Sequence, residues 1–300
     1  MKEKFKNPAI TAPLLVIGII IAMQMSKFAL KNLDSGTNIF VAVGVIQLVA
    51  MGLPCIIYYL MKNRRLSDPI YGISTRGPQI LFVIFAALFF VCGTLLVKFF
   101  YILGGAESAA LVNFYGEITQ TSTEARNIEI LLSLVIIPAV CEELFFRGII
   151  FSEYRRFGTA NAVIISAVCF AMLHFSLTNF FVYLFSGLVF GFVTAMTRSI
   201  LPSVALHLLS NYLSIYASDA FLRITVIKNG AYFIGFVLVM LTALCFILLM
   251  SRVETVCLNY SDRPPVESIP PKSSEHWAEV VFSPTFIILI IVFLTVSLFI

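Results

Sequence analysis

Long apolar runs separated by short polar stretches dominate this chain. The runs are continuous rather than alternating, which is typical of membrane-spanning helices and excludes the strands of a lipid-facing barrel. Nine such segments are predicted, over residues 8–30, 38–61, 80–101, 128–151, 159–175, 178–197, 199–217, 231–251 and 281–300. We therefore expect an all-α, polytopic transmembrane helix bundle, in which the short fifth and seventh segments are tilted or protected by their neighbours.

The composition agrees with this pattern. Hydrophobic residues make up 60% of the chain and charged residues 12%, whereas soluble domains carry roughly 25% charged residues. The net charge of +4 is small and dispersed, so the expected partner is the lipid bilayer and not a nucleic acid. The six cysteines occur singly, without a CxxC spacing. Neither a disulfide framework nor a structural zinc site is expected.

Lysine and arginine residues are distributed unevenly between the two sides of the predicted bundle. If the N-terminus lies in the cytoplasm, that side holds Lys2, Lys4, Lys6, Lys62, Arg64, Arg65, Arg76, Arg155, Arg156, Arg198, Arg252, Arg263 and Lys272. The opposite side holds Lys31, Arg126, Arg223 and Lys228. Basic residues accumulate on the cytoplasmic side of membrane proteins, so a cytoplasmic N-terminus is expected. The first apolar run is too long for a signal peptide, and the short loops favour a prokaryotic cell membrane.

Three regions are predicted along the chain. Residues 1–127 form N-terminal transmembrane helices with an outer loop, residues 128–217 form a core that carries the chemistry, and residues 218–300 form C-terminal transmembrane helices joined by a proline-rich linker. Within the core, Gly187 and Gly191 form a GxxxG pattern. Such a pattern lets a second helix approach closely.

Two consecutive glutamates interrupt the apolar segment 128–151. Ionisable groups inside a membrane are costly and indicate a functional site by default. Glu143 and Arg147 are four residues apart, so they share a helix face and can pair. Glu142 lies about 100° around the helix and is available for another task. A structural ion pair explains Glu143 and Arg147 equally well, but it does not explain Glu142.

Further polar residues lie in later apolar segments. His207 and Asn211 are four residues apart and face one way, and His174 follows Phe170 at the same spacing. Their plainest interpretations are an interhelical hydrogen bond and a buried core histidine. Glu142 and His207 each lie about 13 Å from the cytoplasmic end of their segments, but His174 lies about 27 Å along its own. The fifth helix must therefore be tilted, or begin outside the hydrocarbon, for the three side chains to meet.

Three spaced motifs occur in order on three predicted helices, within about residues 130–215: Glu142-Glu143-xxx-Arg147, Phe170-xxx-His174 and His207-xxx-Asn211. Together they resemble the CPBP family, also called Abi or the type II CAAX prenyl endopeptidases, which contains intramembrane glutamate proteases and bacteriocin-immunity relatives. The resemblance implies an eight-helix bundle, so the ninth segment is interpreted as a C-terminal addition. It also implies a membrane-anchored protein or peptide substrate, such as a lipidated CAAX protein.

Peptide hydrolysis needs an activated water, a stabilised oxyanion and a proton for the leaving amine. We expect Glu142 to be the general base and His174 to help hold and polarise the water. His207 and Asn211 can donate hydrogen bonds to the oxyanion, an assignment that the resemblance also implies. Glu143 and Arg147 are expected to fix the helix and the base, although Glu143 can share the proton transfer.

Several alternatives stay open. Two histidines and a glutamate can bind zinc, but the chain has no HExxH helix and Asn211 is a poor zinc ligand, so no cofactor is expected. Cys141 as a nucleophile is less favoured, because a buried cysteine is usually inert. A non-proteolytic immunity or scaffold protein is the second functional class. A transporter is the third, although no inverted repeat is seen in the sequence.

Overall fold

The computed structural model describes residues 8–31, 38–61, 77–104, 124–217, 230–258 and 278–299. These residues contain helices and no strand, so the predicted all-α bundle is confirmed. Five helical stretches are long and apolar enough to cross a membrane, which makes this a multi-pass membrane protein. Most of the predicted outer loop and the proline-rich linker lie outside the described residues.

Every predicted apolar segment coincides with a helical stretch. The separate helices are α1 (Pro8–Lys31), α4 (Gly77–Leu103), α10 (Thr159–Leu173), α11 (Phe180–Thr197), α12 (Leu201–Tyr216), α14 (Ala231–Leu258) and α16 (Pro284–Phe299). The second segment comprises α2 (Ile39–Gln47), η2 (Leu48–Gly52) and α3 (Leu53–Met61). The predicted short helices are indeed short: α10 has 15 residues and α12 has 16.

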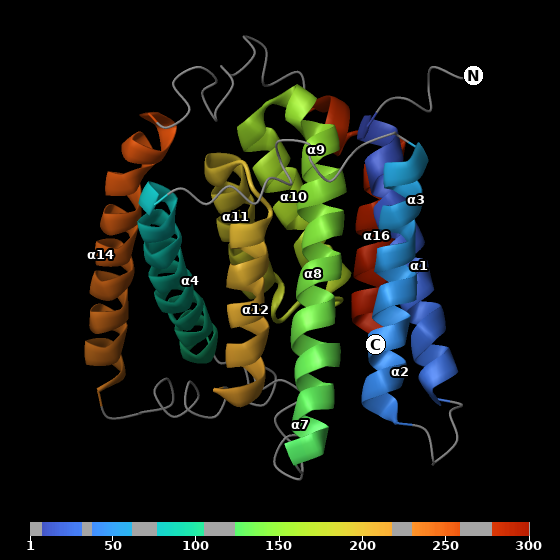
Figure 1. The fold of residues 1–300 in the computed structure, drawn as a ribbon, viewed down its shortest axis with the longest axis horizontal. Helices are drawn as coiled ribbons and strands as arrows, with labels where there is room; N and C mark the ends of the chain where they lie inside the picture. The colour runs from blue at the N-terminus through green and yellow to red at the C-terminus, as the bar shows by residue number, and fades with distance from the viewer. Residues whose placement is uncertain are drawn as a thin grey trace.

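The fourth segment is one long rod through the middle of the molecule (Figure 1). It comprises α7 (Glu124–Ile130), η3 (Leu131–Ile136), α8 (Ile137–Glu143), η4 (Leu144–Ile150) and α9 (Phe151–Tyr154), and it is followed by the 3₁₀ turn η5 (Arg155–Phe157). The stretches η2, η3 and η4 are π-helical. Such wider turns occur mostly as short insertions in α-helices and are frequent at functional sites. Both glutamates lie at the end of α8, between two of these stretches.

The helices form one broad bundle (Figure 1). Helices α4 and α14 lie side by side at one end, α11, α12 and α8 occupy the middle, and α1 to α3 with α16 lie at the other end. The C-terminal helix α16 packs along α1, where Thr285 Oγ1 donates a hydrogen bond to the carbonyl oxygen of Ala9 at 3.1 Å. The ninth segment is thus a helix docked on the first one.

Glycines allow close helix contacts next to the motif helices. A Cβ atom added at Gly187 would lie 2.9 Å from the Cα atom of Ala167 on α10, and one at Gly191 would lie 3.2 Å from a methyl group of Val163. The predicted GxxxG contact is therefore confirmed, between α11 and α10. Gly44 has the same role on α2, because a Cβ atom there would lie 3.1 Å from the Cβ atom of Ser133 on the long rod.

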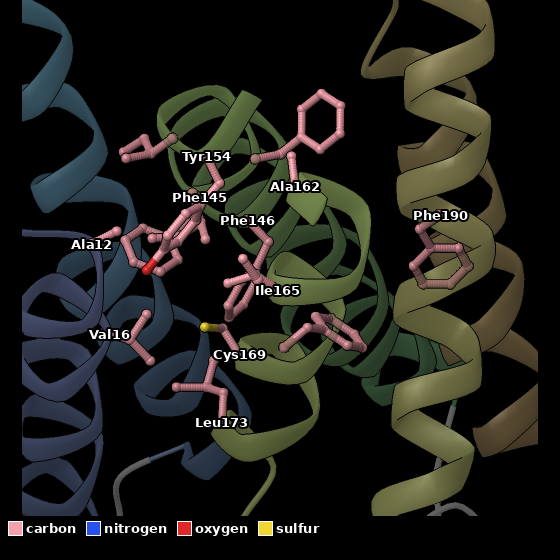
Figure 2. Close-up of a cluster of buried hydrophobic side chains, with 14 of the residues drawn as sticks. Ala12, Val16, Phe145, Phe146, Tyr154, Ala162, Ile165, Cys169, Leu173 and Phe190 are labelled. Atoms are coloured by element: carbon pink, nitrogen blue, oxygen red, sulfur yellow. The ribbon is translucent and has the colours of Figure 1, made fainter. Parts of the chain in front are cut away.

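A hydrophobic core packs around the rod on the side of α1 and α10. Figure 2 shows Ala12 and Val16 of α1 close to Phe145 of the rod and Cys169 of α10. Phe146, next to Phe145, is also fully buried, and its ring packs edge-on against Phe170 at 5.3 Å. This packing holds the π-helical turn η4, and with it Arg147, at a fixed place in the bundle.

Candidate active site

The predicted ion pair between Glu143 and Arg147 is present. Arg147 Nη1 donates to Glu143 Oε1 at 2.8 Å, and both side chains are fully buried. Arg147 Nη2 donates to the carbonyl oxygen of Gly187 at 2.9 Å. The guanidinium also lies 4.9 Å from the ring centre of Phe170 and 5.5 Å from that of Phe190, which adds favourable cation–π contacts. A buried charge of this kind is tolerated only when it is paired and hydrogen-bonded.

His207 lies between the two glutamates. Its Nδ1 atom is 2.9 Å from Glu143 Oε1, and its Nε2 atom is 3.8 Å from Glu142 Oε2. An ionised carboxylate only accepts hydrogen bonds, so Nδ1 is the donor to Glu143 and the ring is held with Nε2 toward Glu142. The ring is also stacked on Phe190, with centres 5.2 Å apart. Sequence reasoning assigned His207 to the oxyanion and did not predict its bond to Glu143.

Glu142 has a partner that sequence reasoning missed. Gln47, the last residue of α2, donates from Nε2 to Glu142 Oε1 at 3.0 Å, and both residues are 8% exposed. The signal was present in the sequence, because Gln47 is the only amide side chain in the apolar stretch 39–60. A single amide in a predicted span is nevertheless weak evidence without knowledge of which helix it faces.

His174 directly follows α10 in the C-cap position, and its ring is tightly held. Nδ1 lies 2.9 Å from the carbonyl oxygen of Phe170, which can only accept, so Nδ1 is the donor and a neutral ring carries its lone pair on Nε2. The ring stacks on Tyr183 of α11 at 3.7 Å. Phe175 follows in the left-handed conformation with φ of +50°, which begins the turn from α10 to α11. The fifth helix therefore ends at this histidine.

Asn211 lies one helical turn beyond His207 on α12. Its Nδ2 atom donates to the carbonyl oxygen of Val135 at 3.4 Å. Val135 belongs to the π-helical stretch η3 of the rod. The side-chain amide of Asn211 thus links α12 to the rod one turn beyond His207.

One cavity of about 300 Å³ brings these side chains together. Its lining includes Gln47, Glu142, His174, His207 and Asn211, and Ser186, Ser210 and Ser214 add hydroxyl groups. The predicted convergence of Glu142, His174, His207 and Asn211 is therefore present, while their catalytic roles stay predictions. Glu143 and Arg147 do not line this cavity and lie behind Glu142 and His207.

The side chains around the cavity can be compared with those that a zinc site or a cysteine nucleophile would need. Within the described residues, no group of three or more histidine, cysteine, aspartate or glutamate side chains is arranged to hold a metal ion. The polar groups next to Glu142 are instead an amide and one imidazole. Cys141 packs in the hydrophobic core, away from the cavity lining.

Comparison with known proteins agrees with the motifs. Residues 125–213 match the model of the family described as Type II CAAX prenyl endopeptidase Rce1-like. The matched segment is less than a third of the chain, and it contains all three motifs from Glu142 to Asn211. The predicted family resemblance is thereby confirmed for this segment. No curated protein and no solved structure matches the chain.

Proposed function

We propose that this membrane protein is an intramembrane endopeptidase in which Glu142 activates a water molecule to cleave membrane-associated proteins or peptides, including lipidated CAAX-type substrates. The observation that carries the proposal is a buried carboxylate on the wall of a polar cavity, surrounded by apolar helices. The family match of residues 125–213 supports peptide hydrolysis over other uses of such a cavity.

Glu142 is the proposed general base, and Oε2 is its reactive atom. Oε1 already accepts a hydrogen bond from Gln47, whereas Oε2 has no donor among the described residues. In the first step, Oε2 takes a proton from water as the water oxygen bonds to the peptide carbonyl carbon. His174 lines the same cavity, and its Nε2 lone pair can accept the second hydrogen of that water.

The oxyanion that forms needs hydrogen-bond donors. Asn211 Nδ2 is one candidate, because its present bond to Val135 is long and is readily exchanged. His207 is the other: its ring lies between the two carboxylates, and Nε2 is a donor in the form of the ring that carries a proton on that nitrogen. When the intermediate collapses, the carbon–nitrogen bond breaks and Glu142 returns its proton to the leaving amine.

Glu143 and Arg147 are proposed to support this chemistry from behind. Arg147 fixes Glu143, and Glu143 in turn fixes the orientation of the His207 ring. Because these three side chains are buried and hydrogen-bonded to one another, the His207 ring keeps its orientation and does not have to reorganise during the reaction. We propose no cofactor, and zinc is the alternative that the assay must test.

The cavity size constrains the substrate. A volume of about 300 Å³ is at the lower end for small-molecule sites, so it suits a short extended segment and not a folded domain. We propose a substrate anchored in the bilayer, presented to a protein whose N-terminus faces the cytoplasm of a prokaryotic cell. The bilayer is the other partner, and no role for nucleic acid is proposed.

The decisive experiment is hydrolysis by the protein purified in detergent. A panel of lipidated and unlipidated peptides is incubated with the wild type and with Glu142→Gln, with and without a chelator. We expect cleavage by the wild type, none by the variant, and no effect of the chelator. Loss of activity with the chelator and recovery with zinc would establish the metal alternative.

Folded wild-type protein that cleaves no peptide would overturn the proposal. The two other functional classes considered from the sequence would then have to be tested. Solute or ion flux in vesicles would favour a transporter, and its absence would favour a non-proteolytic immunity or scaffold protein.

A further inference from the structure

The two oxygens of the Glu142 carboxylate have different surroundings. Oε1 accepts a hydrogen bond from Gln47 Nε2 at 3.0 Å. Oε2 lies 3.8 Å from His207 Nε2 and has no hydrogen-bond donor within the described part of the chain. The terminal torsion of a glutamate is broad and roughly two-fold, so an unrestrained carboxylate can exchange its oxygens. A fixed donor on one oxygen removes that freedom.

Gln47 is itself held in place. Its Nε2 atom also contacts Sδ of Met51 at 3.3 Å, one turn further along, and Met51 is fully buried. The α-helical geometry of α2 ends at Gln47 and the π-helical stretch η2 begins at the next residue. Because Gly44 has no side chain, α2 packs closely against the rod that carries Glu142. The amide is therefore presented by a close helix contact and not by a flexible loop.

A neutral donor suits this position. Arg147 lies behind the glutamates and the His207 ring lies 3.8 Å from Glu142, so a further cation at position 47 would add to the positive charge around Glu142 and oppose the uptake of a proton by the general base. An amide N–H restrains the carboxylate through one hydrogen bond and adds no net charge. Val43, one turn before Gln47, lines the same cavity and offers no polar group.

We infer that Gln47 is a positioning residue for hydrolysis, which orients the Glu142 carboxylate so that Oε2 is the oxygen that meets the water. The residue lies outside the segment 125–213 that matches the family model, on a helix that the three motifs do not include. The inference rests on the proposed function. It extends the site from three helical segments to four.

The test is Gln47→Met, which keeps the length of the side chain and removes the donor. We expect kcat to fall about 10- to 100-fold, as expected for loss of one buried hydrogen bond to a charged group, while KM stays within about twofold. The matched control is Gln24→Met on α1, the same change in a predicted span away from the cavity. That control should leave both kinetic constants unchanged.

A second measurement does not depend on activity. Thermal midpoints of Gln47→Met, Glu142→Met and the double variant form a double-mutant cycle, because each single change removes the hydrogen bond and directly bonded residues then give non-additive effects. If Gln47→Met does not fold, Gln47→Leu replaces it, because that side chain is slightly smaller and also lacks a hydrogen-bond donor. The same loss of kcat is expected.

Three outcomes overturn the inference. Wild-type kcat in Gln47→Met, with Glu142→Gln inactive, removes Gln47 from the reaction and leaves the proposed function intact. Additive thermal effects show that the two residues do not act on each other. A folded wild-type protein without any hydrolysis overturns the proposed function, and the inference with it.

Discussion

His207 Nδ1 and Glu143 Oε1 lie 2.9 Å apart, and the same carboxylate oxygen accepts a hydrogen bond from Arg147 at 2.8 Å. One buried oxygen of Glu143 thus bonds both Arg147, four positions away in the chain, and His207, 64 positions away. The second glutamate of the pair is therefore linked to the third motif, while the first faces the cavity. Adjacent carboxylates on one helix have different partners because they point in directions about 100° apart.

Glu142 is the residue whose loss should affect activity most specifically. Glu142→Gln keeps an oxygen that can accept from Gln47 but removes the base, so hydrolysis should fall by about 10²- to 10⁴-fold. Rates with a lipidated peptide and the amount of folded protein measure this. Glu254→Gln, on the exposed face of α14, is the control and should keep the wild-type rate. A Glu142→Gln protein with near-normal turnover contradicts the assignment.

His207→Ala should abolish hydrolysis while the protein stays folded in the membrane. The change removes the ring between the two carboxylates and leaves Glu143 with Arg147. Asn211→Ala should reduce the rate less, because it removes one donor near the cavity. Both are measured as kcat at saturating peptide. Equal rates for His207→Ala and the wild type would remove this histidine from the chemistry.

Arg147→Ala should act on stability as well as on activity. It leaves Glu143 buried without its cation, and breaking a buried pair costs about 3–5 kcal/mol. Lower yield and a lower thermal midpoint in detergent are expected. Arg252→Ala on the outer helix α14 is the comparison and should have a small effect, because that side chain is only partly buried. A stable but inactive Arg147→Ala would assign Arg147 to the chemistry instead.

Gly187→Ala should destabilise the bundle. The new methyl group would lie 2.9 Å from the backbone of Ala167, so α10 and α11 must separate, and overpacking of this kind typically costs about 1–3 kcal/mol. The same shift would move the carbonyl group that accepts from Arg147. Gly18→Ala on α1, with nothing within 4 Å of the added atom, is the matched control. Equal thermal midpoints for the two variants would contradict the close contact.

The sequence by itself determined the helices and the local pairs. A membrane leaves helices as the solution for continuous apolar runs, so segment positions followed from hydropathy alone. The Glu143–Arg147 pair followed from helical spacing, and the close contact at Gly187 followed from the absence of a side chain. The family resemblance indicated which polar residues meet, and four of them, Glu142, His174, His207 and Asn211, line the cavity.

The tertiary structure alone decided how these groups are connected. The bond from Gln47 to Glu142 joins residues 95 positions apart, and the contact of His207 with both glutamates depends on how α12 faces the rod. Helical periodicity fixes which residues share a face but not which neighbour that face meets. The π-helical stretches beside the site change the local register, and three-residue and four-residue spacings do not reveal them. The partners of Glu142 therefore depend on packing between helices distant in sequence.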